Sequence, residues 1–250
     1  MKLRNSNILI FGGSSGIGKA IAEKLISAGA TVMITGRNID KLEDAKKEIN
    51  SPKLHYAAFD ICDIKNHIDF FEKCSNTMGG LDAFVNSAAF STEAIGRGYE
   101  PWDITEEEWD MLSDTNYKAA FFLMRNEVDY LCEKKISGNI LNISSNAMCM
   151  DIIGGYGAAK LAMERWTRAF AKKYGHLGII INGIAPGATL TPMISSYAHN
   201  TNAKYERHAI ERFIKPEEIA ELAFYLLSDY GEIVCGHTVI ADGGDNAATR

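Results

Sequence analysis

Short apolar runs alternate along the chain with longer segments in which apolar residues recur every three or four positions. The runs have the length and composition of strands buried on both faces, and the longer segments have helical periodicity. Strands are predicted at Asn7–Phe11, Thr31–Thr35, Leu54–Phe59, Leu81–Asn86, Asn139–Ile143, Ile179–Ile184 and His237–Ala241. Helices are predicted between them, at Ile17–Ala28, Asp40–Ile49, Ile64–Met78, Glu106–Lys134, Gly157–Tyr174 and Glu217–Ser228. This alternation predicts an α/β fold, a doubly wound parallel sheet of seven strands with helices on both faces.

Length and composition agree with one domain. The chain has 250 residues, 46% of them hydrophobic and 23% charged, with no internal repeat and no linker rich in Pro, Gly or Ser. We therefore expect residues 1–250 to form a single domain. Two stretches of little periodicity, 90–104 and 189–215, follow strands. Because ligands bind beyond the carboxyl ends of parallel strands, both stretches are candidate rims of a substrate site, with ordinary surface loops as the alternative.

Charge, cysteine content and hydropathy exclude several classes of protein. The net charge of −6 argues against a broad nucleic-acid-binding surface. No apolar run approaches the roughly 18 residues of a membrane span, and Ile8–Phe11 is too short for a signal peptide. The five cysteines lack C-x-x-C spacing and the six histidines form no i, i+4 pair, so neither disulfides nor a metal site is expected. These features predict a cytoplasmic protein.

A glycine-rich turn joins the first strand to the first helix. Gly12, Gly16 and Gly18 have the spacing G-x-x-x-G-x-G. Glycines let the backbone approach a pyrophosphate without a Cβ clash, and the N-terminus of the following helix offers free N–H groups to the phosphates. An ordinary tight turn can also contain three glycines. Their position between a strand and an amphipathic helix favours nucleotide binding.

The end of the second predicted strand indicates which dinucleotide is bound. Sites for NAD commonly carry Asp or Glu at this point, where the carboxylate binds the ribose hydroxyls. Here Gly36 is followed by Arg37, whose guanidinium can bind a 2′-phosphate in a bidentate manner. NADP(H) is therefore predicted in preference to NAD(H). The competing interpretation is that Arg37 is a solvent-exposed loop residue.

Tyr156 and Lys160 lie one turn apart on a predicted helix, so their side chains share a face. A phenol has a pKa of about 10, and a neighbouring ammonium group stabilises the phenolate. The tyrosine of such a pair can donate and recover a proton near neutral pH. The spacing alone is a weak signal, since a tyrosine at a helix start beside a solvated lysine has the same pattern.

Together with other motifs, these features make the whole chain resemble the short-chain dehydrogenase/reductase family. The ordered motifs that carry the similarity are the glycine turn 12–18, Asp60-Ile61, Val85–Ala89, Asp114–Asn116, Asn142–Ser145, Asn182–Thr191 and Ala241–Gly244. Three departures from the family pattern stand out. Phe11 occupies the place of a usual threonine, Ser87–Ala89 alter the end of the fourth strand, and Ser145 precedes Tyr156 by fewer residues than is usual.

The resemblance implies hydride transfer between NADP(H) and a carbonyl or secondary alcohol, with these residues in named roles. Tyr156 would be the general acid–base, and Lys160 would lower its pKa and bind the nicotinamide ribose. Ser145 would hydrogen-bond the substrate oxygen, and Asn116 would hold a water that links Lys160 to solvent. The cofactor-binding residues implied are Gly12, Ser14, Ser15, Gly16, Ile17, Gly18, Arg37, Asp60, Ile61, Asn86, Ala88, Tyr156, Lys160, Pro186, Gly187, Thr189 and Thr191.

Several alternatives stay open on the sequence. Ser144 is the alternative to Ser145 as the catalytic serine, because it restores part of the missing spacing to Tyr156. The substrate could be a 3-oxoacyl thioester, a sugar or polyol, or a hydrophobic ketone. Family members are usually homotetramers or homodimers, so we expect one of these. A catalytically silent nucleotide-binding scaffold or sensor is the competing function, and the intact set of four catalytic residues argues against it.

Overall fold

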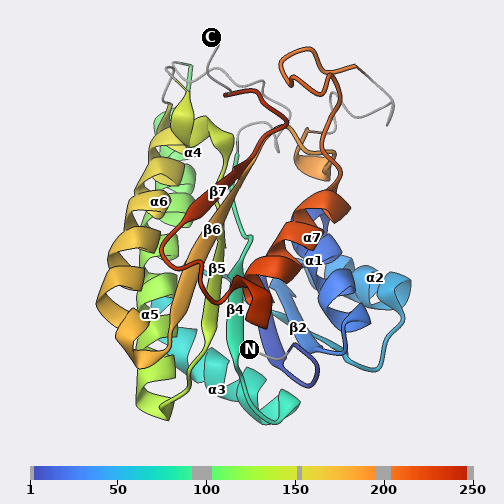
Figure 1. The fold of residues 1–250 in the computed structure, drawn as a ribbon, viewed down its shortest axis with the longest axis vertical. Helices are drawn as coiled ribbons and strands as arrows, with labels where there is room; N and C mark the ends of the chain where they lie inside the picture. The colour runs from blue at the N-terminus through green and yellow to red at the C-terminus, as the bar shows by residue number, and fades with distance from the viewer. Residues whose placement is uncertain (1–2, 92–102, 151–153, 195–203, 247–250) are drawn as a thin grey trace.

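The fold is described from a computed structural model that covers residues 3–91, 103–150, 154–194 and 204–246 (Figure 1). Seven strands form one parallel sheet in the order β3-β2-β1-β4-β5-β6-β7. They are β1 (Asn7–Phe11), β2 (Thr31–Gly36), β3 (Leu54–Ala58), β4 (Ala83–Asn86), β5 (Asn139–Ile143), β6 (Ile180–Pro186) and β7 (Thr238–Ala241). The doubly wound, Rossmann-like sheet predicted from the sequence is confirmed. The strand order reverses between β1 and β4, which is where such sheets bind ligands.

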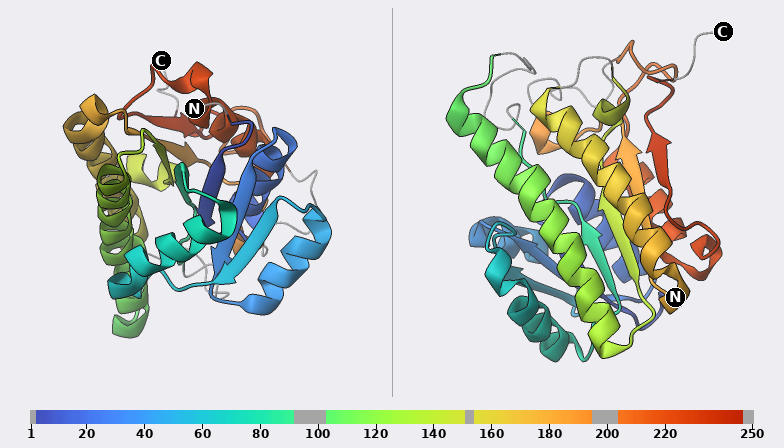
Figure 2. Two further views of the ribbon diagram at one scale, coloured as in Figure 1. Left: turned by 90° about the horizontal axis from the view of Figure 1, so that it is seen from below. Right: turned by 90° about the vertical axis from the view of Figure 1, so that its left-hand side faces the viewer.

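Helices cover both faces of the sheet (Figures 1 and 2). On one face are α1 (Gly16–Ser27), α2 (Ile39–Ile49) and α7 (Pro216–Leu227), and on the other are α3 (His67–Met78), α5 (Ala120–Lys134) and α6 (Gly155–Tyr174). Short 3₁₀ turns are η1 (Ile64–Asn66), η4 (Asn146–Cys149), η5 (Gly175–Leu177), η6 (Pro192–Ile194) and η7 (Asp229–Gly231). The alternation of side chains along β1 places Ile8 and Ile10 against the first group and Leu9 against the second.

The predicted helix Glu106–Lys134 is continuous, but its hydrogen bonding changes part-way. It begins as α4 (Glu106–Leu112), becomes a π-helical turn η3 (Ser113–Ala119) and continues as α5. The π turn carries Asn116, whose Nδ2 donates to the carbonyl of Phe90 (2.6 Å) and whose Oδ1 accepts the amide of Phe90 (2.8 Å). The wider turn therefore anchors the segment that follows β4. Such turns are frequent at functional sites, and apolar periodicity does not show them.

Phe11, at the position of the usual threonine, is fully buried at the end of β1. Its ring packs among other aromatic side chains, those of Phe59, Phe70 and Phe71. Phenylalanine has no hydroxyl group to bond the neighbouring strand, and main-chain hydrogen bonds join the start of the glycine turn to β2 and β4. The amide of Ser87 donates to the carbonyl of Phe11 (2.9 Å), and the amide of Gly12 donates to that of Thr35 (2.9 Å). With phenylalanine at this position, the main-chain contact between the end of β1 and the end of β4 is present.

A buried polar cluster connects β4 and β5 to the helices behind them. Asn86 and Asn142 are paired in register, and Asn86 Nδ2 donates to Asn142 Oδ1 (2.8 Å) and to Glu127 Oε2 (3.0 Å). Asn142 Nδ2 in turn donates to Thr167 Oγ1 (3.0 Å). Burial raises the pKa of Glu127 to about 8, so this carboxyl group is mostly protonated in the folded protein at neutral pH.

Replacing Glu127 by glutamine should make stability less dependent on pH. An unfolded glutamate titrates near 4.5, so unfolding releases the Glu127 proton and the free energy of unfolding falls as pH rises from about 4.5 to 8. Glutamine stays uncharged and keeps an oxygen for Asn86. We expect Glu127→Gln to have a higher Tm than the wild type at pH 8. The difference should be about 2–4 °C for each kcal/mol by which the two free energies of unfolding differ, and it should be smaller at pH 5. An equal gap at both pH values would contradict this explanation.

Candidate active site

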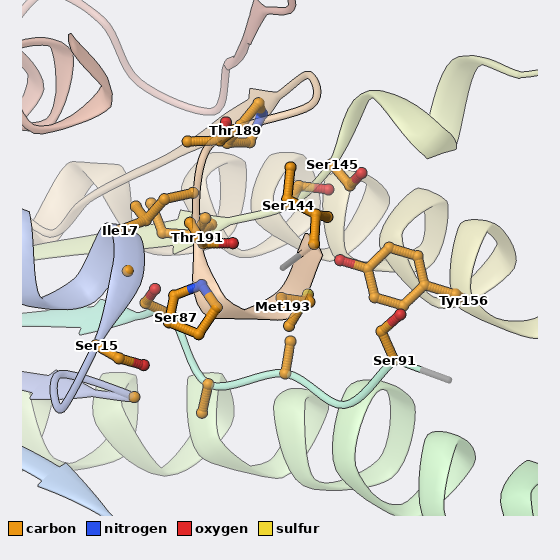
Figure 3. A pocket seen from close by; sticks show the side chains of 18 of the residues that line it. Ser15, Ile17, Ser87, Ser91, Ser144, Ser145, Tyr156, Thr189, Thr191 and Met193 are labelled. Carbon is orange, nitrogen blue, oxygen red and sulfur yellow. The ribbon is translucent and has the colours of Figure 1, made fainter. Parts of the chain in front are cut away.

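A cleft of about 850 Å³ opens beyond the carboxyl ends of the strands (Figure 3). The predicted site residues that line it are Gly12, Ser14, Ser15, Gly16, Ile17, Arg37, Asp60, Ile61, Ala88, Ser145, Tyr156, Lys160, Pro186, Gly187, Thr189 and Thr191. Three other predicted residues, Gly18, Asn86 and Asn116, do not line it. Loops that lie far apart in the sequence therefore bring most of the predicted set together in one cavity.

The glycine turn forms a cradle that side chains would fill. A Cβ on Gly12 would lie 2.6 Å from the amide nitrogen of Ala88, and Gly12 has a positive φ of 77°. A Cβ on Gly18 would lie 2.3 Å from the carbonyl oxygen of Gly12, so Gly18 allows α1 to pack against the turn. The side chain of Ser15, at the N-cap of α1, makes no capping bond to the helix. The first N–H groups of α1 thus have no side-chain cap, which fits a phosphate-binding turn.

Two cations lie at the end of the cleft formed by β2 and α2. Arg37 and Lys41 both line it, and in the part of the chain that the structure describes neither has a carboxylate within ion-pair distance. Asn38 between them caps α2, because its Oδ1 accepts the Lys41 amide (3.0 Å). Sequence reasoning found Arg37 but missed Lys41. The signal available was its place four residues after Arg37, in the predicted first turn of the helix that follows.

Tyr156 and Lys160 stand on the first two turns of α6. Lys160 is 1% exposed, and its Nζ donates to the carbonyl of Ile143 at the end of β5 (3.0 Å). The Nζ lies 5.5 Å from the centre of the Tyr156 ring, and Figure 3 shows the Tyr156 hydroxyl directed into the cavity. Burial lowers the pKa of Lys160 to about 8, so its amine is still mainly an ammonium group at neutral pH. This arrangement can stabilise a phenolate at Tyr156.

The two neighbouring serines differ in what their hydroxyl groups do. Ser144 is buried, and its Oγ donates to the carbonyl of Lys160 (3.0 Å), which ties β5 to α6. Ser145 Oγ accepts the amide of Ala147 (3.2 Å) and donates to none of the described residues. Only the Ser145 hydroxyl therefore has its proton available for a substrate oxygen. This geometry supports Ser145 over Ser144 as the catalytic serine.

Two predicted residues have their side chains engaged elsewhere. Asn116 bonds Phe90 and so holds the segment that contributes Ser91 to the cleft, whereas Asn86 bonds Glu127 within the buried cluster. A role of the Asn116 side chain in holding a water, and direct cofactor contact by Asn86, stay predictions. The contribution that the structure does show for both is to position the strand ends around the cleft.

Further residues line the substrate end of the cleft. Met193, Tyr205, Arg207 and Phe213 belong to the stretch 189–215 predicted as a candidate rim, and Met150 belongs to the run Met148–Met150, whose place beside Ser145 favours an apolar substrate wall. Of the lining residues at this end, Asp245 was not predicted. Asp245 accepts hydrogen bonds from Asn146 Nδ2 (2.9 Å) and Arg207 Nε (3.3 Å), which joins the turn after Ser145 to the C-terminal segment. Of the predicted loops, residues 92–102 and 195–203 lie outside the described residues. Nothing in the sequence distinguishes Asp245 from an ordinary loop residue.

Comparison with known proteins decides the family. A family model described as Enoyl-(Acyl carrier protein) reductase matches residues 12–246, nearly the whole chain. The chain belongs to the short-chain dehydrogenase/reductase family. Its relatives are named dehydrogenases and reductases of CH–OH or C=O groups, and this chain is likewise a nicotinamide-dependent dehydrogenase/reductase of that kind, as the sequence motifs predicted.

Individual relatives of this short-chain dehydrogenase/reductase have various substrates in their names. A 2,5-dichloro-2,5-cyclohexadiene-1,4-diol dehydrogenase of Sphingobium indicum is 32% identical over 98% of each chain. A 3-oxoacyl-[acyl-carrier-protein] reductase of Aquifex aeolicus is 28% identical, also over 98% of each. A solved short-chain type dehydrogenase/reductase from Mycobacterium ulcerans has a TM-score of 0.88 and 26% identity, and the match covers 98% of this chain and 91% of that one.

The described residues contain no group of three or more His, Cys, Asp or Glu side chains that could hold a metal ion. None of the helices in this part of the chain has the length and hydropathy needed to cross a membrane.

Proposed function

We propose that this protein is an NADP(H)-dependent oxidoreductase that transfers a hydride between nicotinamide and a carbonyl or secondary alcohol, with residues 1–250 acting as one domain. The observation that carries the proposal is that Ser145, Tyr156 and Lys160 face the same cleft as the glycine turn. One cavity thus combines a phosphate cradle with an acid–base group and a hydroxyl donor. A silent scaffold would have no need for the buried lysine beside the tyrosine.

The preference for NADP(H) is supported by charge at the β2 end of the cleft. Arg37 and Lys41 present two cations, and Gly36 stands where a ribose-binding carboxylate is common. A 2′-phosphate would bind both cations, whereas the 2′-hydroxyl of NADH would leave them without a partner. The glycine turn and the N-terminus of α1 would hold the pyrophosphate. When bound, the cofactor supplies or accepts the hydride.

The protein's own groups account for the proton and for the developing charge. In the reducing direction the Tyr156 hydroxyl donates its proton to the substrate oxygen, and in the oxidising direction the phenolate takes it back. The Lys160 ammonium lowers the energy of that phenolate, and its bond to the Ile143 carbonyl fixes it in place. Ser145 donates a hydrogen bond to the substrate oxygen as negative charge develops there.

The substrate end of the cleft combines apolar and polar groups. Met150, Met193 and Phe213 supply an apolar wall, and Arg207 with Asp245 supplies a polar edge. We retain three substrate classes: 3-oxoacyl thioesters, sugars or polyols, and hydrophobic ketones. The names of two relatives include a cyclic diol and a 3-oxoacyl carrier-protein thioester, which supports keeping more than one substrate class.

We also propose a cytoplasmic homodimer or homotetramer. The support is the exposure of large apolar side chains on the segment that contains α4 and η3, namely Trp109, Met111 and Tyr117. Light scattering coupled to size-exclusion chromatography measures the mass, and a monomer would contradict the proposal.

The function is tested by mixing the protein and NADPH with ketones, 3-oxoacyl thioesters and keto sugars while following NADPH absorbance. We expect turnover with at least one class, and loss of that turnover in Tyr156→Phe. Binding of NADPH without turnover of any compound, unchanged by Tyr156→Phe, would favour the silent scaffold.

Arg37→Glu tests the cofactor preference. Loss of a charge-assisted bond and gain of a like charge should weaken NADPH binding by about 10- to 100-fold, while NADH binding changes little. Fluorescence titration with each nucleotide measures both dissociation constants. Lys172→Glu is the matched control, because it makes the same charge change at an exposed position of α6 away from the cleft. Equal weakening of both nucleotides in Arg37→Glu would refute the preference.

A further inference from the structure

His208 has no place in the motifs described above, yet it is fully buried where three segments meet. It belongs to the turn 205–212, and the segments after β6 and β7 pack against its ring. A Cβ on Gly187 would lie 2.7 Å from His208 Nε2, and a Cβ on Gly243 would lie 3.1 Å from its Cγ. The imidazole therefore occupies the space that these two glycines leave.

The hydrogen bonds of the ring define its tautomer. Nδ1 lies 2.7 Å from the carbonyl oxygen of Arg212, and Nε2 lies 3.2 Å from the amide nitrogen of Ala188. A carbonyl can only accept and a backbone N–H can only donate. The proton is thus on Nδ1, and Nε2 accepts through its lone pair. Both ring nitrogens of His208 therefore take part in hydrogen bonds to the main chain.

The amide that Nε2 accepts belongs to the segment Pro186–Thr191, which lines the cleft. The same segment has two main-chain bonds to Ile214, which donates to the Ala188 carbonyl (3.0 Å) and accepts from the Leu190 amide (2.9 Å). At its far end Thr191 contacts the glycine turn, since a Cβ on Gly16 would lie 3.1 Å from Thr191 Cγ2. At the near end the Gly187 amide donates to the Ala241 carbonyl (3.0 Å), and His208 adds a side-chain acceptor for the next amide, that of Ala188.

The same ring also contacts the substrate end of the cleft. Tyr205 lines the cleft, and the centre of its ring lies 4.5 Å from the centre of the His208 ring in an edge contact. Tyr205 in turn packs on Phe213, at 4.6 Å between ring centres. His208 therefore joins the wall of the cleft to the segment that faces the glycine turn.

We propose that His208 is a positioning residue for the dinucleotide site: as the Nδ1–H tautomer it holds the Ala188 amide, and with it Pro186–Thr191, in the place that the cofactor requires. The inference rests on the proposed function as a dinucleotide-dependent oxidoreductase. Without the bond, the segment samples several positions. Cofactor binding must then order the segment, and the conformational entropy lost makes the free energy of binding less favourable. Affinity for the cofactor falls, and the proton-transfer groups on α6 are untouched.

Two variants separate the hydrogen bond from the packing. Phenylalanine fills the space but neither accepts nor donates, whereas glutamine retains an oxygen that can accept the Ala188 amide. We expect His208→Phe to raise the Kd and KM for NADPH about tenfold, with a smaller change in kcat. His208→Gln should stay within about threefold of the wild type. Leu131→Ala, a buried change in α5 away from the cleft, controls for general loss of stability.

Two further measurements do not depend on turnover. Hydrogen exchange of the Ala188 amide in the free protein should be slow in the wild type and in His208→Gln, and faster in His208→Phe. Nitrogen-15 NMR of wild-type His208 should show the proton on Nδ1. If His208→Phe does not fold, the role of His208 is still tested by the tautomer seen in NMR and by the NADPH affinity and Ala188 exchange of His208→Gln.

The outcomes separate the inference from the function on which it rests. A wild type that binds no dinucleotide overturns the proposed function, whereas the exchange and NMR results still test the contact. A proton on Nε2, unchanged Ala188 exchange in His208→Phe, or unchanged NADPH affinity in that variant overturns the role of His208. So does a loss of NADPH affinity in Leu131→Ala equal to that in His208→Phe at a similar Tm.

Discussion

Replacing Tyr156 by phenylalanine should reduce kcat by on the order of 10³-fold while NADPH still binds, because the change removes the hydroxyl that we propose as the proton donor and little else. The ring stays beside Lys160, whose Nζ is held by the Ile143 carbonyl independently of the phenol. Absorbance at saturating NADPH measures kcat, and fluorescence titration measures the affinity for NADPH.

Tyr174→Phe is the matched control, since Tyr174 is the last residue of the same helix and does not line the cleft. We expect it to keep near wild-type turnover. If Tyr156→Phe keeps more than about a tenth of the wild-type kcat, Tyr156 is not the general acid.

Ser145→Ala should lower kcat/KM by about 10²- to 10³-fold, because it removes the hydroxyl that we propose donates to the substrate oxygen as charge develops there. Ser144→Ala should retain most of the activity and lower the Tm instead, since the Ser144 hydroxyl is bonded to the Lys160 carbonyl inside the protein. Each variant is the control for the other, because the side chains are identical and adjacent. Measured kcat/KM and Tm in the opposite order would move the catalytic position to Ser144.

The fold was predictable because parallel strands buried on both faces are uninterrupted apolar runs, such as Ile8–Phe11 in β1. The π-helical turn was not, because its side chains continue the helical pattern and only the hydrogen bonds change. The effect of Phe11 could not be derived either. Whether the turn loosens depends on main-chain bonds to the neighbouring strands, which a list of residues does not contain.

Site residues could be predicted from the sequence where their contacts lie within a short motif. Residues within a motif, such as Tyr156 and Lys160, carry their geometry in their spacing, and the structure brings them to one cleft. His208 bonds Ala188, twenty residues away, through a ring nitrogen that no spacing rule identifies. Lys41 and Arg207 are ordinary charged residues until the fold places them at the cleft.

The reversal of strand order between β1 and β4 divides the cleft along the sequence. The glycine turn, Arg37 and Lys41, which we propose bind the cofactor phosphates, come from the first part of the chain, whereas Ser145 and Tyr156 come from β5 onward. We therefore expect substitutions at Arg37 or Lys41 to change the nucleotide preference and to leave the positions of Ser145 and Tyr156 unchanged.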